Sequence, residues 1–246
     1  MIHLRSDRAF RENRVILDEA ERYALDGAPA ETIEGLIHPR EGLLLYVLAR
    51  RAAHLGDIVE IGSYKGKSTW YLAQGLADAG SPHKVVSIDP HEDPAQREAY
   101  FANLERHGLL ARVEPVVDYS HDVAQRFDRK VGMLWIDGDH SYASVREDFD
   151  DWFPRLEVGG WYAMHDTVNA WYGPTRLARE LLGHRDDLAR IGVVWLVLFA
   201  QKVAPSVRAR AGGIRARAAF EALTLAQARR NGLGPQAAAA GERGGR

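Results

Sequence analysis

Residues 57–69 read DIVEIGSYKGKST, and this stretch decides the fold. A short apolar run enters a turn that carries two glycines, and a helix-compatible segment follows the turn. The same alternation of apolar run and helical segment begins again at residues 84, 113, 131 and 159. Such alternation predicts an α/β fold with a doubly wound, mostly parallel sheet and helices on both faces. Ligands of these sheets bind beyond the carboxyl ends of the strands, so the segments that follow the apolar runs are candidates for a site.

The chain before this core is expected to be helical. We expect residues 1–54 to form a helical cap or lid, with one amphipathic helix over residues 8–26 and a second that begins at Pro39. Tyr23 or the LIHPREG stretch could supply the part of the lid that covers a ligand.

The main domain is expected to span residues 55–202 and to end in the β-prone stretch LARIGVVWLVLFAQK. This stretch could make two closing strands, at least one of them antiparallel at the sheet edge. Residues 203–246 carry eight Arg against two Glu and are rich in Ala and Gly. We expect a basic, partly disordered tail there, with one exposed helix over AFEALTLAQARR.

Composition excludes several classes of protein. The chain has 246 residues and no Cys, which rules out disulfides, thiolate metal sites and a cysteine nucleophile. No signal-peptide pattern and no apolar run of ~20 residues is present, so we expect a cytoplasmic protein without a membrane partner. The net charge of -2 combines an acidic body with a basic tail, which does not suit a nucleic-acid enzyme. The sequence leaves a homo-oligomer possible.

The first turn after the opening apolar run predicts a binding site for a nucleoside that carries an amino acid. Gly62 and Gly66 allow a sharp turn and close approach to a ligand, and Ser68 or Thr69 can cap the helix that follows. The pattern is neither G-x-G-x-x-G nor G-x-x-x-x-G-K-[ST], which argues against NAD and ATP. Glu60 could attract the amino group of an amino-acid ligand, which favours S-adenosylmethionine. The turn itself contributes Gly62, Ser63, Gly66 and Ser68 to the predicted cofactor site.

The next two apolar runs end in further candidates for nucleoside contacts. Asp89 follows the second run, where an acid can accept both ribose hydroxyls. Asp118, Tyr119 and Ser120 follow the third, where an adenine ring would lie, and the residues leave open which of the three takes its exocyclic amine. Each could also be an ordinary turn residue.

Four segments together resemble a known family: VEIGSYKGKST, VVSIDPHE, WIDGDHSY and LEVGGWYAMHD. They are similar to class I methyltransferases, in particular to the catechol-type and natural-product sugar O-methyltransferases, over about residues 40 to 200. The resemblance implies seven strands with the last antiparallel, S-adenosylmethionine as cofactor, and methyl transfer to a small hydroxylated acceptor such as a natural-product sugar or aglycone. The main domain would then be the catalytic, S-adenosylmethionine-binding domain.

The ends of the fourth and fifth apolar runs predict the chemical site. Asp137, which also borders the cofactor, and Asp166 could together hold Mg²⁺, which prefers oxygen ligands. The resemblance matches them to the two metal-binding Asp residues of the catechol-type enzymes. The next family ligand is Asn or Asp, but Thr167 stands there. His165, Asp139 or water could complete the set of ligands.

The same segments offer a general base. His140 is the favoured base, because its ordinary pKa lies near neutrality, and Asp139 is the second choice. Both residues could instead only begin the following helix, and His165 could be a buried core histidine. A metal-independent N- or O-methyltransferase and a non-catalytic or differently reacting relative therefore stay open. Trp171 and Tyr172 could close over an acceptor ring.

Overall fold

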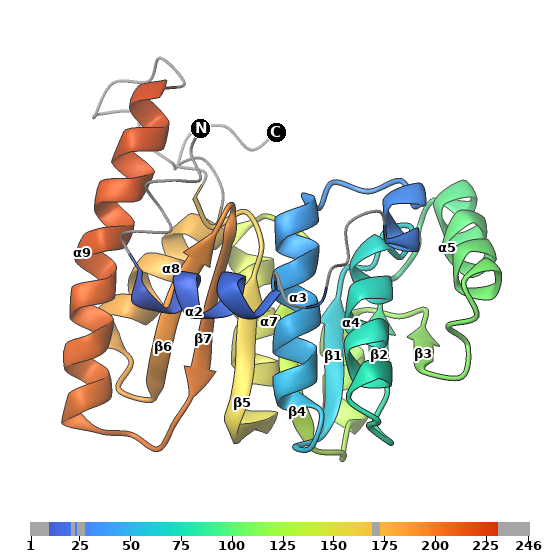
Figure 1. Cartoon of the computed structure of the whole chain (residues 1–246), viewed down its shortest axis with the longest axis horizontal. Coiled ribbons are helices and arrows are strands. Elements are labelled where there is room, and N and C mark those ends of the chain that lie inside the picture. Colours follow the sequence, from blue (N-terminus) through green and yellow to red (C-terminus); the bar gives the residue numbers. More distant parts are fainter. Residues whose placement is uncertain (1–9, 21–22, 24–27, 169–172, 231–246) are drawn as a thin grey trace.

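A computed structural model describes residues 10–20, 23, 28–168 and 173–230 of the chain (Figure 1). Trp171 and Tyr172 lie outside the described residues. A single sheet of seven strands forms the centre of the molecule, in the order β3-β2-β1-β4-β5-β7-β6. The strands are β1 (Asp57–Ile61), β2 (Val85–Ile88), β3 (Val113–Val116), β4 (Val131–Ile136), β5 (Leu156–Met164), β6 (Leu188–Val194) and β7 (Val197–Lys202). The predicted doubly wound, mostly parallel seven-stranded sheet is confirmed.

The strands β1 to β5 pair in parallel, and β7 is antiparallel to both of its neighbours. The antiparallel strand therefore lies inside the sheet, between β5 and β6, and the edge strand is β6. The two expected closing strands therefore form this side of the sheet, and the last strand of the chain is antiparallel, as the resemblance implies.

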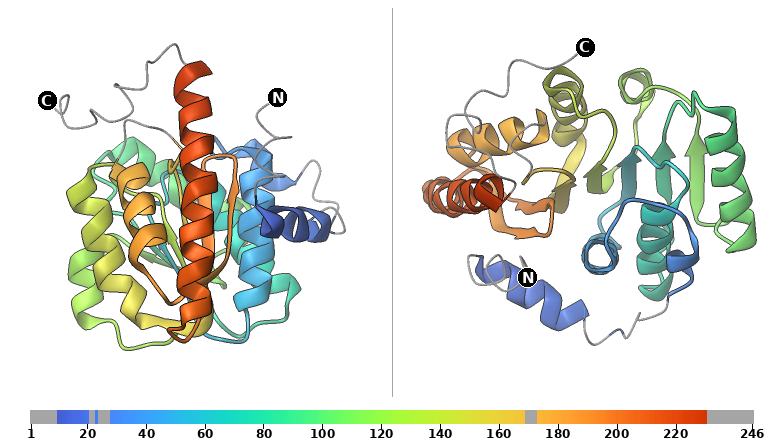
Figure 2. Two further views of the ribbon diagram at one scale, coloured as in Figure 1. Left: turned by 90° about the vertical axis from the view of Figure 1, so that its left-hand side faces the viewer. Right: turned by 90° about the horizontal axis from the view of Figure 1, so that it is seen from above.

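Helices cover both faces of the sheet, and each face has its own hydrophobic core. The first core includes buried residues of α3 (Pro39–Ala52), α4 (Lys67–Asp78) and α5 (Pro94–Arg106). The second includes residues of α6 (Ser120–Arg126), α7 (Tyr142–Trp152) and α8 (Gly173–His184). The view from above separates the two layers clearly (Figure 2). The short 3-10 helices η2 (Pro29–Thr32) and η3 (Phe153–Arg155) complete the connections.

Helix α3 begins at Pro39 as predicted, but it belongs to the core. Its first turn is closed by a capping box, in which the side chains of His38 and Glu41 bond to each other's backbone region. The helix packs tightly on α4, since a Cβ at Gly75 would meet Tyr46 O at 2.6 Å. Most of its side chains are fully buried. Residues 39–52 therefore form a core helix, and a cap or lid from the N-terminal region stays a prediction.

The described part of the first helix, α2 (Arg11–Ala20), covers the sheet edge. Asn13 lies fully buried and bonds to the backbone of β6 in both directions. Its Nδ2 donates to Val193 O at 2.5 Å, and its Oδ1 accepts from Val193 N at 2.8 Å. The side chain thus takes the hydrogen bonds that a further strand would take, which protects the edge from pairing with another chain.

The C-terminal helix α9 (Val207–Arg230) corrects the expectation of an exposed tail helix. It starts twelve residues before Ala219, where the expected helix began, and it packs against α8 and β6. Phe220 is completely buried in this contact, and Thr224 and Ala228 are buried beside it. Small Ala and Gly residues on its inner side let the helix approach closely. The high content of the same residues had predicted a partly disordered tail. Residues 231–246 lie outside the described residues.

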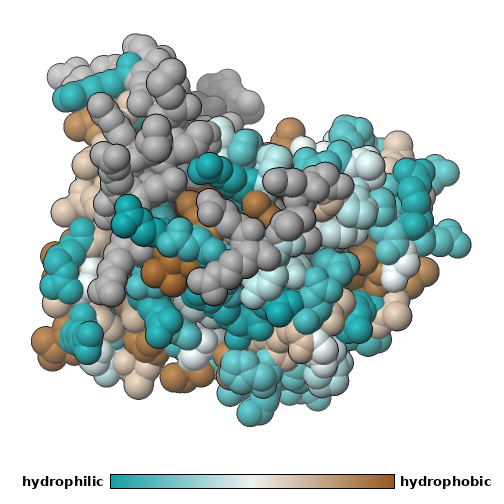
Figure 3. Space-filling view, in the orientation of Figure 1, coloured by the Kyte–Doolittle hydropathy of each residue, from teal (hydrophilic) through white to brown (hydrophobic). Residues whose placement is uncertain are grey.

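The surface is mixed in character. On the face seen in Figure 3, hydrophilic residues are widespread and the described hydrophobic ones form small groups. Within the described ranges, no helix combines the length and the apolar character that a membrane span requires.

Candidate functional site

A cavity of about 710 Å³ opens beyond the carboxyl ends of the parallel strands. This is the position that doubly wound sheets use for ligands, and the volume suits a nucleoside-sized molecule. The predicted site residues that line it are Gly62, Ser63, Ser68, Asp89, Tyr119, Ser120, Asp137, Asp139, His140, His165 and Asp166. Glu60, Gly66 and Asp118 do not line it.

The glycine turn brings the start of α4 to the cavity. Gly62 has φ of 84°, and a Cβ there would meet Asp137 O at 2.2 Å, so only glycine lets the first loop pass this close to the fourth. Gly66 has φ of 90° and caps α4 without a side-chain hydrogen bond. The cavity is therefore lined by the first helical residues, Lys67 and Ser68. A helix start of this kind favours a carboxylate ligand.

Glu60 is placed below the turn and does not reach the ligand cavity. It is fully buried and accepts hydrogen bonds from Thr69 Oγ1 at 2.6 Å and Ser87 Oγ at 2.7 Å. Burial raises the pKa of the Glu60 carboxyl to about 7. Glu60 does not line the cavity, and its side chain joins β1 to α4 and β2. A contact between Glu60 and the cofactor stays a prediction.

Asp89 lines the cavity and also orders the turn. Its Oδ2 accepts from the backbone N–H of Ser63 at 2.9 Å and of Tyr64 at 3.0 Å. Its Oδ1 accepts from His91 N at 2.8 Å. A carboxylate has about four acceptor positions, so Asp89 keeps capacity for a ligand hydroxyl on its cavity side.

The three candidates at the end of β3 separate in the structure. Asp118 turns outward to Arg126, 2.6 Å from its Nη2, and this hydrogen bond lowers the pKa of the Asp118 carboxyl. Tyr119 lines the cavity with its hydroxyl donated to Glu92 at 2.6 Å. Ser120 lines the cavity as well and donates its hydroxyl to Asp148. The sequence did not point to Asp148, because it lies within a helix rather than at a strand end.

The ends of β4 and β5 bring together Asp137, His140, His165 and Asp166. One ligating atom from each of the four lies within 4.8 Å of the others. His165 Nδ1 is 3.2 Å from Asp137 Oδ1 and 3.4 Å from Asp166 Oδ2. His140 Nε2 is 2.8 Å from the same Asp166 oxygen. Asp166 has φ of 53°, an uncommon backbone conformation that points its carboxylate into this group.

The charges in this cluster depend on one another. Burial opposes a charge on His165, but the carboxylates of Asp137 and Asp166 outweigh it and raise the His165 pKa well above its usual range. Burial raises the pKa of Asp137. At Asp166 the burial penalty is outweighed by hydrogen bonds from His140 and His165, and the pKa of the carboxyl falls well below its usual range.

Comparison with known proteins shows a similarity to one family of domains. Residues 59–167, which include the turn, Asp89 and the whole cluster, match the family model described as a methyltransferase domain. This part of the chain is therefore similar to a methyltransferase domain.

Solved structures share this fold. The O-methyltransferase TomG from Streptomyces achromogenes, solved with S-adenosylmethionine, is 21% identical with a TM-score of 0.56, and the match covers 83% of this chain and 100% of TomG. The O-methyltransferase from Bacillus cereus, solved with S-adenosylhomocysteine, is 19% identical with a TM-score of 0.54, and the match covers 82% of this chain and 100% of that one.

Curated relatives match a shorter part of the chain. The uncharacterized protein y4gI of Sinorhizobium fredii is 25% identical over 118 residues, which make up 45% of this chain and 13% of that protein. The uncharacterized protein R132 of Acanthamoeba polyphaga mimivirus is 26% identical over 122 residues, and the match spans 53% of its length.

Glu41 also contacts the cluster, although no sequence pattern pointed to this residue. Its side chain is 2% exposed, and its Oε2 lies 3.3 Å from His165 Nε2. The same carboxylate accepts from His38 N at 2.9 Å and from Leu196 N at 3.0 Å. The capping pattern of His38, Pro39 and Glu41 could have signalled a helix start, but nothing local signals the contact with His165.

Thr167 and Asp139 form hydrogen bonds outside the cluster. Thr167 donates its hydroxyl to Leu196 O at 2.8 Å and is fully buried, so it stays outside the cluster. Asp139 accepts from Ser144 Oγ at 2.7 Å and from Ser141 N at 3.3 Å, and these bonds lower the pKa of its carboxyl. Asp139 therefore anchors the start of α7, as the simpler interpretation held, and is a poor base. His140 lies in the cluster.

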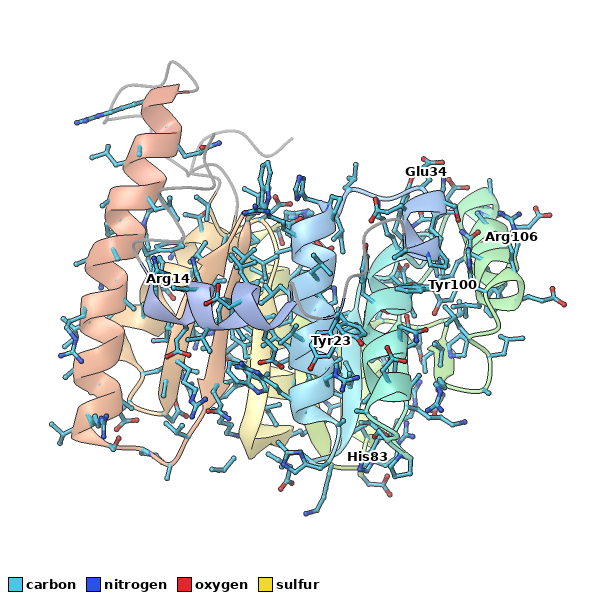
Figure 4. The ribbon with its side chains drawn as sticks, viewed as in Figure 1. Arg14, Tyr23, Glu34, His83, Tyr100 and Arg106 are labelled. Carbon is cyan, nitrogen blue, oxygen red and sulfur yellow. The ribbon has the colours of Figure 1, made fainter. Side chains whose placement is uncertain are left out.

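The segment before α3 contributes Gly35, Leu36 and Ile37 to the wall of the cavity. Glu31 pairs with Lys67 at 3.1 Å, and Glu34 pairs with Lys65 at 2.7 Å. Figure 4 places Glu34 at the end of the molecule opposite His83, which precedes β2. Leu36, in the LIHPREG stretch, lines the cavity and is 92% exposed. Tyr23 instead packs on Tyr46, with ring centroids 5.2 Å apart.

Proposed function

We propose that the chain transfers a methyl group from S-adenosylmethionine to a hydroxyl of a small metabolite, such as a natural-product sugar or aglycone. One observation carries the proposal: a single cavity is lined both by the glycine turn with Asp89 and by the cluster of His140, Asp166 and Asp137. The first group suits the cofactor and the second suits a hydroxyl that must lose its proton. The similar O-methyltransferases with bound cofactor support this assignment.

The cofactor has one arrangement that satisfies these groups. Its carboxylate would face the start of α4 at Ser68, where the helix dipole favours negative charge. Its ribose would face Asp89, and its adenine would extend toward Ser120. The sulfonium methyl group would then point to the cluster around Asp137.

The cluster fits a divalent cation. Apart from His140, which we propose as the base, it offers two carboxylates and the imidazole of His165 at a buried strand end. Metal-ligating histidines commonly donate their second ring N–H to a carboxylate, and Glu41 stands at that place behind His165. Mg²⁺ is the ion that the family resemblance implies, and a nitrogen ligand also suits Mn²⁺ or Zn²⁺. A bound cation would orient the acceptor and lower the pKa of its hydroxyl.

The proposed reaction moves a proton from the acceptor hydroxyl and a methyl group to the acceptor oxygen. His140 takes the proton of the acceptor hydroxyl, and Asp166 orients its ring through the 2.8 Å contact. The acceptor oxygen forms a bond to the methyl carbon while the carbon–sulfur bond breaks. The electron pair of that bond stays on sulfur, which leaves S-adenosylhomocysteine.

The test is methyl transfer from isotope-labelled S-adenosylmethionine to a panel of catechols and hydroxylated glycosides. The protein is first stripped of metal and then assayed with chelator, Mg²⁺ or Mn²⁺. We expect labelled ether products only when a cation is present. Products formed on nitrogen, or no product with any acceptor of the panel, would count against the proposal.

A second candidate is methylation without a metal, with His140 acting alone. It is favoured by His165, whose raised pKa places a positive charge between Asp137 and Asp166 where a cation would otherwise lie. Full activity in chelator would support this second candidate over the first. A cytoplasmic location, the absence of a nucleic-acid partner and a homo-oligomer stay predictions.

A further inference from the structure

The cofactor cavity has an acidic side chain in its wall that the proposed function does not use. Asp148 projects from α7, lines the cavity and is 7% exposed. No cation pairs with it among the described residues of the chain. Burial raises the pKa of its carboxyl to about 6, although the hydrogen bond from Ser120 acts in the opposite direction.

The contacts of Asp148 leave one oxygen for a ligand. Ser120 donates its hydroxyl to Oδ1 and so fixes the orientation of the carboxyl group. Oδ2 accepts no hydrogen bond from the part of the chain that the structure describes. A Cβ at Gly138 would lie 3.9 Å from Oδ2, so this oxygen lies beside the loop after β4. Because Asp148 lines the cavity, Oδ2 is an acceptor that a ligand with a hydrogen-bond donor can use.

The arrangement of the cavity identifies the donor. Ser68 and Asp89 take the carboxylate and the ribose of the proposed cofactor, so its base lies on the side of Ser120 and Asp148. The exocyclic amine of adenine is a hydrogen-bond donor, and Oδ2 is an acceptor in the wall on that side. We propose that Asp148 accepts this amine, positioned by Ser120, and that it selects adenine over bases with a carbonyl oxygen at the same place. This inference rests on the proposed binding of S-adenosylmethionine.

Neighbouring polar groups are less suited to this role. The Tyr119 hydroxyl is donated to Glu92 at 2.6 Å. Asp118 is held outside the cavity by Arg126. Glu147 also lines the cavity, but its side chain is 60% exposed and faces His121 at 3.8 Å. An exposed carboxylate discriminates weakly, because water can replace the missing partner.

The experiment compares two ligands by titration calorimetry on the full chain. S-adenosylhomocysteine carries the amine, and S-inosylhomocysteine carries a carbonyl oxygen in its place. We expect the native chain to bind the first about tenfold or more tightly than the second. Asp148→Asn should reduce this preference to within about threefold or reverse it, because the amide N–H can donate to the carbonyl oxygen. Asp150→Asn makes the same charge change on the exposed side of α7 and should keep the native preference.

Equal affinity of the native chain for both ligands would overturn the inference without the need for a variant. A full native preference in Asp148→Asn would overturn it too, as would a loss of preference in Glu147→Gln instead. If the native chain binds neither ligand, the proposed function fails and this inference fails with it. If the native chain binds S-adenosylhomocysteine but shows no preference over S-inosylhomocysteine, the inference fails while the proposed function stands.

Discussion

Glu41 and His165 are 124 residues apart in the chain, yet their side chains meet in a buried contact with 3.3 Å between Oε2 and Nε2. Through this contact the first turn of α3 supports the chemical cluster. Glu41 also accepts backbone N–H groups from the start of its own helix and from Leu196 in the turn between β6 and β7. Three segments of the fold thus converge on one carboxylate.

Replacement of this carboxylate is expected to destabilise the protein. Glu41→Gln removes the charged partner of His165 Nε2, leaves only the two carboxylates at Nδ1, and presents an N–H group in place of an acceptor. We expect a loss of about 2 to 3 kcal/mol in the free energy of unfolding, measured by urea denaturation. Glu98→Gln changes an exposed acid and should stay within about 0.5 kcal/mol of the native chain. An equally small effect of both changes would contradict the supporting role.

Asp89 is expected to control the affinity for the cofactor. Asp89→Asn removes the charge that accepts the ribose and the two N–H groups of the turn. We expect S-adenosylhomocysteine to bind about tenfold more weakly or worse, as measured by calorimetry. Glu92→Gln is a suitable control, because Glu92 is exposed and does not line the cavity. An unchanged affinity in Asp89→Asn would remove Asp89 from the binding site.

Asp166 and Asp139 should differ in their effect on a cation. Asp166→Asn removes a ligand from the cluster, and we expect Mn²⁺ binding to the variant to weaken by about tenfold or more in calorimetric titrations. Asp139→Asn should bind Mn²⁺ nearly as the native chain does, because Ser144 and Ser141 already hold the Asp139 carboxylate. The opposite order of effects would show that the ligands have been assigned wrongly.

Glu60 should make stability depend on pH. Its pKa is about 7 in the folded chain against 4.5 for the free group, so the folded state holds the proton more tightly. The stability that this proton contributes is present below about pH 4.5 and is lost as the pH rises through about 7. Relative to the native chain, Glu60→Gln should therefore gain stability between about pH 5 and about pH 8, by up to about 3 kcal/mol. Urea denaturation of both proteins at about pH 5 and about pH 8 measures this gain in stability. If the stability difference between Glu60→Gln and the native chain is the same at both pH values, the raised pKa of Glu60 is refuted.

Helix α9 is expected to contribute to folding stability. Phe220→Ala deletes a completely buried ring and should cost about 3 to 5 kcal/mol in urea denaturation. Ile214→Ala lies on the same helix, where the side chain is 54% exposed, and should cost less than about 1 kcal/mol. Similar small losses for both variants would mean that the helix is only loosely attached.

Local sequence patterns predicted most of the sheet and part of the site. The apolar runs and glycine turns gave the parallel strands, since a buried strand and its turn are determined by adjacent residues. Their positions at strand ends were enough to predict the four residues of the cluster, and the structure brings these residues together: Asp137, His140, His165 and Asp166. Where a strand end left several candidates, as at Asp118, the sequence could not choose, because the choice depends on a partner such as Arg126.

The features that the sequence did not reveal depend on contacts between distant segments. Glu41 reaches the cluster only because α3 packs beside β5 and the β6–β7 turn. Glu60 was expected at the ligand because it is charged, but the hydroxyl groups of Thr69 and Ser87 bond its Oε2 within the core. The packing of Phe220 was hidden because an Ala- and Arg-rich segment has the composition of a disordered tail.

The most direct test of the account is a calorimetric titration of the full chain with S-adenosylhomocysteine, followed by Mg²⁺ or Mn²⁺, and repeated in the presence of chelator. We predict binding of S-adenosylhomocysteine in every buffer and a further heat of cation binding that disappears with chelator and in Asp166→Asn. Binding of the nucleoside without any cation heat would favour metal-free transfer by His140. No binding of S-adenosylhomocysteine under any condition would contradict the central claim that the chain is an S-adenosylmethionine-dependent methyltransferase.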